Sequence, residues 1–204
     1  MPRIFTLLFL FFVGSIAAQV KLKSELPLAD QSFKNCNGTD LTLRQALGEN
    51  GLVLVFSCNT CPFVVGTPDF PGWERQYNDL YNFAKEQKVG FVLLNSNEAK
   101  RDKADSFSEM EIRAKTMSYL MPYLVDEKSA LANALEAKTT PHVFLFDKDL
   151  KLIYSGSIDN IWDNKRKKDI PYLKNAIIGM VLNNKIQFKE TPPRGCSIKR
   201  VSNP

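Results

Sequence analysis

Cys58 and Cys61 are the residues of this chain best placed to do chemistry. Both follow directly after an apolar run at residues 51–56, and Pro62 comes next. A run that is apolar on both faces predicts a central strand, and proline is favoured at the first position of a helix. The pattern therefore places the two thiols between the end of a buried strand and the start of a helix.

A helix start favours ionisation of a nearby thiol. The unpaired N–H groups and the macrodipole of a helix N-terminus stabilise the thiolate, which is the reactive form of cysteine. Pro62 would put Cys61 near the N-cap, with its sulfur facing the free N–H groups, while Cys58 lies in the preceding turn. We predict a redox dithiol. Convention makes the first cysteine the attacker, and helix capping points slightly towards Cys61.

The same spacing also fits part of a metal site. A closed zinc site needs four ligands, but the chain has one histidine, His142, and its other cysteines, Cys36 and Cys196, are distant in the sequence. Copper(I) bound by Cys58, Cys61 and His142 is chemically reasonable, because thiolates suit that ion. The dithiol is preferred, with no metal and no cofactor, since no nucleotide or flavin motif is present.

The N-terminus has the pattern of a signal peptide. Arg3 precedes an uncharged apolar stretch at residues 4–13, and small residues follow. The apolar stretch is shorter than the roughly 20 residues that span a bilayer. We predict a cleaved signal peptide at residues 1–18, export to the periplasm or the extracellular space, and no membrane attachment after cleavage. Disulfides persist in those compartments.

The rest of the chain has the length of one ordinary domain. We predict this domain at residues 19–185, followed by a C-terminal tail at residues 186–204 that carries Cys196. The net charge of +5 comes from dispersed basic residues apart from a run at residues 165–168. That run has no interleaved aromatic residues and favours a solvated helix start, so we expect no nucleic-acid partner.

The order of elements predicts the fold class. Strand-like apolar runs alternate with helical patterns early in the chain, and a β-hairpin follows at residues 141–155 around a turn at residues 147–149. This order is typical of an α/β fold with a mixed central sheet flanked by helices. A strong turn signal at residues 35–38 predicts an N-terminal β-hairpin extension.

Three segments together carry a resemblance to a known superfamily. They are residues 56–63 (FSCNTCPF), residues 140–147 (TPHVFLFD) and residues 195–199 (GCSIK). In this order they resemble exported proteins of the thioredoxin-like superfamily, on its redoxin or peroxiredoxin-related branch. The resemblance extends from about residue 26 to residue 199.

The resemblance implies a thioredoxin-like fold and names further site residues. Pro141 would be a cis proline beside the dithiol, and Thr140 would present its backbone to an incoming peptide or disulfide. Two departures matter. Ser57 stands where thioredoxins usually have tryptophan. Cys58 and Cys61 stand where peroxiredoxins have threonine and the peroxide-reactive cysteine.

The remaining cysteines leave two roles open. Four cysteines allow three pairings, and the short spacing makes Cys58–Cys61 the natural redox pair. Cys196 lies in the GCSIK segment, so the resemblance gives it some role. It would form a structural bridge with Cys36, which we favour, or act as a resolving thiol for Cys61.

These patterns predict an exported thiol–disulfide oxidoreductase. Its partners would be protein thiols and disulfides, together with an upstream thiol that donates or accepts electrons. The direction of electron flow and the oligomeric state are not predicted. One alternative is a thiol peroxidase with Cys61 as the peroxide-reactive thiol and an antioxidant role. The other is a copper-binding or non-catalytic redoxin-fold module.

Overall fold

A computed structural model describes residues 21–201 of the chain. The predicted signal peptide at residues 1–18 and the last three residues of the predicted tail lie outside the described residues. In the part that is described, no helix is both long enough and apolar enough to cross a membrane.

A mixed five-stranded sheet forms the centre of the domain, in the order β5-β4-β3-β7-β8. β3 pairs in parallel with β4, and β4 with β5, whereas β7 is antiparallel to both β3 and β8. The strands are β3 (Gly51–Ser57), β4 (Val89–Asn95), β5 (Tyr123–Val125), β7 (His142–Asp147) and β8 (Leu152–Gly156). Every residue of β3 is buried, as its uninterrupted apolar run predicts.

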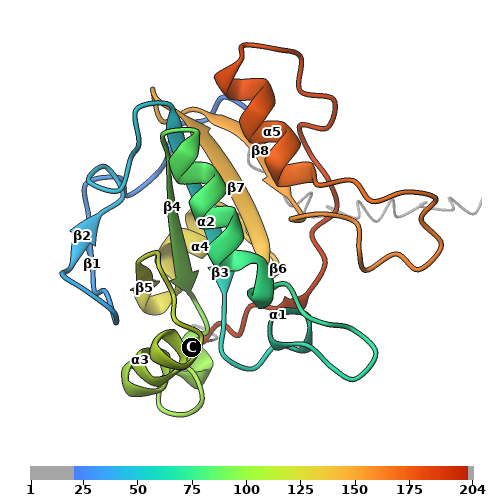
Figure 1. The fold of residues 1–204 in the computed structure, drawn as a ribbon. Helices are drawn as coiled ribbons and strands as arrows, with labels where there is room; N and C mark the ends of the chain where they lie inside the picture. Colours follow the sequence, from blue (N-terminus) through green and yellow to red (C-terminus); the bar gives the residue numbers. More distant parts are fainter. Residues whose placement is uncertain (1–20, 202–204) are drawn as a thin grey trace, which may run out of the picture.

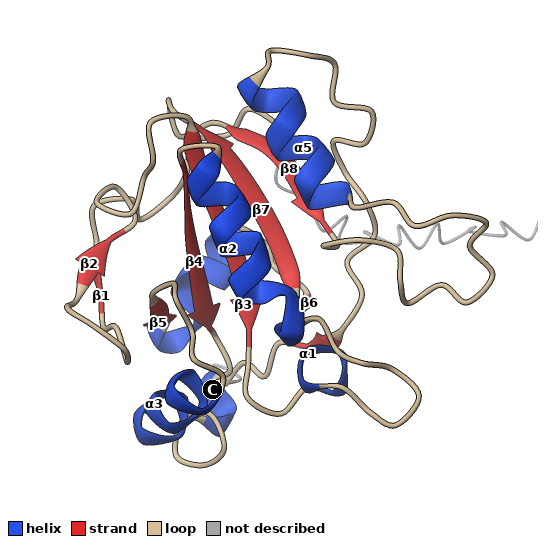
Figure 2. Ribbon diagram, in the orientation of Figure 1, coloured by secondary structure: helices blue, strands red, loops and turns tan. Residues whose placement is uncertain are grey.

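Helices cover both faces of this sheet (Figure 2). On one face, buried side chains of α2 (Tyr77–Glu86), α3 (Phe107–Thr116) and α5 (Tyr172–Val181) join alternate strand residues in one apolar cluster. On the other face, α4 (Ala130–Ala134) and the N-terminal segment cover the remaining strand residues. The mixed sheet flanked by helices confirms the predicted thioredoxin-like fold class.

Two short extensions flank the domain. The predicted N-terminal hairpin is present as β1 (Ser32–Phe33) paired with β2 (Leu41–Thr42). At the other end, β9 (Cys196–Ser197) pairs antiparallel with β6 (Thr139–Thr140). Figure 1 shows the red C-terminal segment running back past β6 and α1 towards α3. The tail therefore reaches the end of the sheet where β3 delivers the two cysteines.

The helix after the cysteines is a single turn, α1 (Pro62–Val65). It ends at Gly66, which has a φ of 95°, a conformation that L side chains rarely adopt. Gly72 has a φ of 72°, and a Cβ there would lie 2.4 Å from the carbonyl oxygen of Val64. The chain therefore folds back closely on α1 before α2 begins.

Candidate active site

Cys58 and Cys61 lie at the carboxyl end of β3, between this central strand and α1. Both are buried, with 2% and 3% of their surface exposed. Cys61 is the N-cap residue of α1, and Pro62 occupies the first helical turn. The strand and the turn thus hold both sulfurs beneath the surface at one end of the sheet.

The loop that leads into β7 supplies the next contacts to the sulfurs. The Thr140–Pro141 peptide bond is cis, as the resemblance implied. The Sγ of Cys58 lies 3.2 Å from the hydroxyl of Thr140, and the Sγ of Cys61 lies 2.9 Å from the carbonyl oxygen of Thr140, to which it donates when it is protonated. The predicted residues Cys58, Cys61, Thr140 and Pro141 therefore come together, while their catalytic roles stay predictions.

The C-terminal tail adds a third cysteine to this cluster. The backbone N–H of Cys196 donates to the Sγ of Cys61 at 3.3 Å, and Cys196 is paired with Thr140 between β9 and β6. Gly195 permits this approach because a Cβ at that position would lie 2.1 Å from the carbonyl oxygen of Thr140. Its missing side chain lets the tail press against the loop beside the dithiol.

The surroundings of Cys61 lower its pKa to about 5. The largest cause is a hydrogen bond from the thiol of Cys58, and further donors are the thiol and backbone N–H of Cys196 and the hydroxyl of Thr140. Burial opposes this effect, and so does the nearby carbonyl oxygen of Thr140. The donors outnumber the opposing groups, so Cys61 is the sulfur that carries the negative charge.

The predicted role of the helix start was wrong in its detail. The side chain of Cys61 makes no capping hydrogen bond. Its carbonyl oxygen accepts from the N–H groups of Val64 and Val65 instead, at 2.8 and 2.9 Å. Its sulfur lies against β6 and the tail, where it contacts Thr140 and Cys196. A helix of one turn also has only a small macrodipole.

Cys58 has the opposite electrostatic setting. Its pKa is raised, first because its thiol donates to the Cys61 sulfur, then by burial and by the negative charge of Asp105. One sulfur of the pair thus holds the proton while the other is ionised. The electrostatics favour Cys61 as the attacking thiol and Cys58 as the thiol that reacts second.

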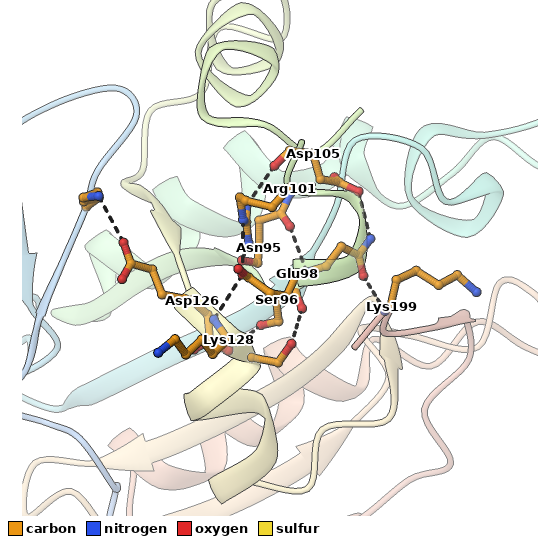
Figure 3. Close-up of polar contacts among 12 residues, drawn as sticks. Asn95, Ser96, Glu98, Arg101, Asp105, Asp126, Lys128 and Lys199 are labelled. Carbon is orange, nitrogen blue, oxygen red and sulfur yellow. Dashed lines mark hydrogen bonds and ion pairs between the residues drawn. The ribbon is translucent and has the colours of Figure 1, made fainter. Parts of the chain in front are cut away.

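A buried polar network fixes the loop between the two cysteines. Asp105 is fully buried and accepts from the backbone N–H of Asn59 at 2.9 Å, from the side chain of Asn95 at 2.8 Å and from that of Asn97 at 3.0 Å. Figure 3 shows Asp105 beside Asn95, with Lys199 of the tail nearby. The backbone N–H of Lys199 donates to the side-chain oxygen of Asn97 at 2.8 Å. The same network therefore holds the reactive loop and the tail.

Sequence reasoning missed this network. Asn95 ends β4, and Asn97 and Asp105 follow in the polar segment that leads to α3. Polar residues placed just after a buried parallel strand lie at the edge where the strands' carboxyl ends meet, which is where α/β sheets place their sites. That position was the available signal.

The other two cysteines do not pair in this structure. All four cysteines are free thiols. Cys36 lies beside β5, where its N–H donates to the carbonyl oxygen of Tyr123 at 3.1 Å, while Cys196 contacts Cys61. The favoured Cys36–Cys196 bridge is not formed here, because β9 carries Cys196 to Thr140 instead. The Cys58–Cys61 disulfide stays a prediction.

His142 does not take part in the dithiol site. Its Nδ1 accepts from the N–H of Lys138 at 3.1 Å, and its Nε2 contacts the hydroxyl of Ser155 at 3.2 Å. Burial lowers the pKa of His142 to about 3, so the ring is neutral. Within residues 21–201, no three histidine, cysteine or acidic residues gather in a way that could bind a metal. The alternative copper site of Cys58, Cys61 and His142 is therefore not assembled among the described residues.

Comparison with solved structures gives two similar proteins over nearly the whole chain. An uncharacterized conserved protein from Geobacillus kaustophilus is 28% identical, with a TM-score of 0.79 over 90% of this chain and 94% of the other. A hypothetical protein from Sinorhizobium meliloti 1021 is 25% identical, with a TM-score of 0.77 over 91% and 98%. A search of curated proteins gave no significant match.

More distant structures share the fold. The peroxidoxin BcpB from Mycobacterium tuberculosis is 16% identical, with a TM-score of 0.53 over 81% of this chain and 99% of the other. A putative protein disulfide isomerase from Bacteroides thetaiotaomicron is 14% identical, with a TM-score of 0.55 over 80% and 91%. The Redoxin family model matches residues 21–176, which include the dithiol, the cis proline and the whole five-stranded sheet. The chain belongs to the Redoxin family.

Proposed function

We propose that the protein is an exported thiol–disulfide oxidoreductase that exchanges disulfides with protein partners through Cys58 and Cys61. Membership of the Redoxin family supports thiol redox chemistry. The observation that carries the proposal is the unequal setting of the two sulfurs. Cys61 has a pKa of about 5, and the Cys58 thiol that donates to it has a raised pKa.

This arrangement suits a two-step exchange. The thiolate of Cys61 attacks one sulfur of a partner disulfide, the partner S–S bond breaks, and the second partner sulfur leaves as a thiolate and takes a proton. Cys58 then loses its proton and attacks the sulfur of Cys61. A Cys58–Cys61 disulfide forms, and the first partner sulfur leaves as a thiol. The partner is reduced by two electrons, and the protein is oxidised by two.

Thr140 and Asp105 assist these steps because they hold the two sulfurs and the loop between them in place. The hydroxyl and carbonyl of Thr140 contact the two sulfurs on one side, and Asp105 holds the backbone of Asn59 on the other. In the reverse direction, the same contacts serve a Cys58–Cys61 disulfide that oxidises a partner dithiol. Export through the predicted signal peptide would place this chemistry where partner disulfides persist.

Redox titration tests the proposal. The purified protein is equilibrated with mixtures of reduced and oxidised glutathione, quenched with acid and alkylated, and the Cys58–Cys61 disulfide is measured by mass spectrometry. We expect a reversible two-electron transition. A potential near −270 mV, like that of thioredoxin, would indicate a reductant, and one near about −120 mV would indicate an oxidant. A dithiol that stays permanently oxidised or never forms a disulfide would favour a non-catalytic module.

A thiol peroxidase is the second candidate, because the reactive sulfur is both acidic and nearly covered. Cys61 is only 3% exposed, and a peroxide needs less room than a protein disulfide. Its thiolate would attack one peroxide oxygen, the O–O bond would break, and the other oxygen would leave and take a proton to give water or an alcohol. Cys61 would become a sulfenic acid, which a second thiol converts to a disulfide with release of water. Peroxide consumption that is lost in Cys61→Ser but kept in Cys58→Ser with added thiol would support this alternative.

A further inference from the structure

The C-terminal tail occupies the strand edge that faces the dithiol. β6 consists of Thr139 and Thr140 only, and its pairing partner is β9, with Thr140 opposite Cys196. An unpaired strand edge is a ready site for an extended chain to add by backbone hydrogen bonds. Here a segment of the same chain already fills that position, so a partner peptide cannot pair with Thr140 while β9 is docked.

The docked segment also brings its own sulfur to the reactive one. The thiol and the N–H of Cys196 both act as donors to the Cys61 sulfur. Cys196 is half-buried, while Cys58 and Cys61 are almost fully buried. Of the three sulfurs in this cluster, Cys196 is therefore the easiest for another protein to reach.

We propose that Cys196 is a third redox-active thiol, which takes the disulfide from Cys61 and presents it to protein partners on the tail. This inference rests on the proposed function and adds a carrier to it. The thiolate of Cys196 attacks the Cys61 sulfur of the Cys58–Cys61 disulfide. The Cys61–Cys196 bond forms, the Cys58–Cys61 bond breaks, and Cys58 leaves as a thiolate that takes a proton. The number of electrons in the protein is unchanged.

The second step passes the disulfide outward. A partner thiolate attacks the sulfur of Cys196, and Cys61 leaves as a thiolate. The partner is now joined to Cys196 in a mixed disulfide. A second thiol of the partner attacks the partner sulfur of this bond, so the partner leaves with a disulfide of its own and Cys196 returns to the thiol form. Of Cys61 and Cys196, Cys61 is the better leaving group, because a thiol of low pKa leaves faster. Run backwards, the same steps reduce a partner disulfide.

The charges around Cys196 favour its role as the attacking thiol in the first transfer. In the reduced protein the pKa of Cys196 is raised to about 11, first by burial and then by the neighbouring Cys61 sulfur, while Lys199 lowers it. Once Cys61 is part of a disulfide it no longer carries charge, so it no longer raises the pKa of Cys196. The influence of Lys199 remains. Oxidation of the buried dithiol thus makes Cys196 a better nucleophile at the moment when it is needed.

The tail has a fixed position, which makes the transfer intramolecular. On one side of Cys196, Gly195 packs against the carbonyl of Thr140. On the other side, the N–H of Ile198 donates to the carbonyl of Lys138 at 3.1 Å, and the N–H of Lys199 donates to Asn97. These contacts hold the two sulfurs at a high effective concentration.

Disulfide mapping in variants that lack one of the four cysteines tests the proposal. Oxidised glutathione is added in slight excess to purified Cys58→Ser and Cys61→Ser, and samples are quenched with acid, alkylated and digested with trypsin. The digest separates residues 45–75, which contain the dithiol, from residues 195–199 and from residues 35–44, which contain Cys36. We expect Cys58→Ser to link residues 45–75 to residues 195–199 with loss of the transient glutathione adduct. Cys61→Ser should give little of this linkage.

Gly195→Ala in the Cys58→Ser background provides the geometric control. Its Cβ cannot fit against Thr140, so the tail must shift and the linkage should form at least about tenfold more slowly, since misplacement by about 1 Å can cost that much or more. Cys36 should stay a free thiol in every sample. Partner exchange is then measured with a reduced model protein: Cys196→Ser should slow oxidation of this protein by the Cys58–Cys61 disulfide at least tenfold.

The outcomes separate this inference from the proposed function. If Cys58→Ser keeps a stable glutathione adduct on Cys61 while the Cys58–Cys61 couple of the wild type titrates normally, the carrier role of Cys196 is wrong and the dithiol function stands. If the Cys61–Cys196 linkage forms but Cys196→Ser oxidises the model protein as fast as the wild type, the carrier role is also wrong. If Cys58 and Cys61 form neither a disulfide nor an adduct, the proposed function itself fails.

Discussion

The two extensions of the domain each carry one cysteine, and only one of them reaches the reactive sulfurs. The N-terminal hairpin places Cys36 beside β5, against the backbone of Tyr123. The C-terminal tail places Cys196 against Cys61. The pKa values of both thiols are raised, to about 12 for Cys36 and about 11 for Cys196. Two thiols whose pKa values are similarly raised therefore differ in position, since only Cys196 contacts the dithiol.

The two extensions are also held in different ways. The hairpin is fixed by backbone pairing to β5, where Asn35 pairs with Leu124, and by burial of Phe33 in the core. The tail is fixed by Asn97, which belongs to the network that also holds the loop between the cysteines. The tail is therefore coupled to the reactive loop through the carboxylate of Asp105. The hairpin reaches the same loop through Tyr123, whose N–H donates to Asn35 and whose hydroxyl donates to Asn59.

The largest expected difference lies between Cys61→Ser and Cys36→Ser. Cys61→Ser removes the only sulfur with a lowered pKa among the four cysteines, so exchange with oxidised glutathione should fall by at least about 10³-fold, as loss of a nucleophile does in other enzymes. Cys36→Ser should change the rate by less than about twofold. Stopped-flow release of reduced glutathione measures both. A large loss in Cys36→Ser would show that the hairpin cysteine belongs to the site.

The rates at which Cys61 and Cys36 are alkylated should depend differently on pH. A thiol reacts as the thiolate, and the pKa of Cys61 is about 5. Its relative alkylation rate should therefore be constant from about pH 6.5 to 8 and should fall as the pH drops through 5. Cys36, with a pKa of about 12, should gain reactivity with every rise in pH across that range. Quantification of alkylated tryptic peptides over time gives both profiles.

Removal of the Cys58 thiol sharpens that experiment. Its hydrogen bond is the largest cause of the lowered pKa of Cys61, so in Cys58→Ala, which has no donor at this position, the midpoint of the alkylation profile of Cys61 should move to higher pH. The pKa of Cys36 should not change. An unchanged midpoint would mean that the tail and Thr140 alone stabilise the thiolate.

Asp105→Asn should disturb the tail and the loop together. The carboxylate is buried and accepts hydrogen bonds from three N–H groups. In Asp105→Asn an NH₂ group replaces one of the two accepting oxygens, so at least one of these N–H groups loses its acceptor. Unfolding free energy should fall by about 2–3 kcal/mol, as measured by urea denaturation. Trypsin should also cut the folded protein faster at Arg194 and Lys199, because the anchor of the tail is weakened.

Asp40→Asn is the matched variant in the hairpin. Asp40 is exposed and accepts from the N–H of Asn35 at 3.0 Å. Loss of this carboxylate should lower the unfolding free energy by less than about 1 kcal/mol. Cleavage of the tail by trypsin should be unchanged. Equal effects of the two substitutions on the tail would contradict the coupling between tail and loop.

The fold and the dithiol could be predicted because their signals are local. An apolar run predicts β3, the turn at residues 147–149 predicts the β7–β8 hairpin, and the spacing of Cys58 and Cys61 is visible directly. The cis proline at Pro141 came from resemblance. The sequence left open whether Cys196 meets Cys36 or Cys61, because Cys61 and Cys196 are 135 positions apart and the path of the tail depends on backbone pairing with β6.

The donors that acidify Cys61 could not be predicted for a similar reason. The helix rule placed Cys61 correctly at the N-cap. It could not reveal that the backbone carbonyl of the same residue satisfies the N–H groups of Val64 and Val65. The sulfur lies against β6 and the tail, and neither is close in sequence.

The smallest expected effect comes from two arginines that fasten the extensions. Arg44 forms an ion pair with Asp30, and more than half of each side chain is exposed. Arg200 of the tail donates to the side chain of Asn133 and to the carbonyl oxygen of Ala137, both at 2.6 Å. Exposed ion pairs contribute little, so Arg44→Ala should leave the unfolding free energy nearly unchanged. Arg200→Ala should cost about 1–2 kcal/mol, because a hydrogen bond from a charged donor to a partly buried carbonyl, here that of Ala137, is worth more.

The decisive readout for this pair is the reactivity of Cys61 rather than stability. If Arg200 helps to keep β9 on β6, Arg200→Ala should increase the rate at which a bulky maleimide modifies Cys61 by a fewfold, while Arg44→Ala should leave it unchanged. Urea denaturation run beside the alkylation keeps global unfolding separate from release of the tail. A maleimide rate that is equal in both variants would mean that β9 stays docked without Arg200, and that the shared network of Asn97 and Asp105 alone holds the tail over the dithiol.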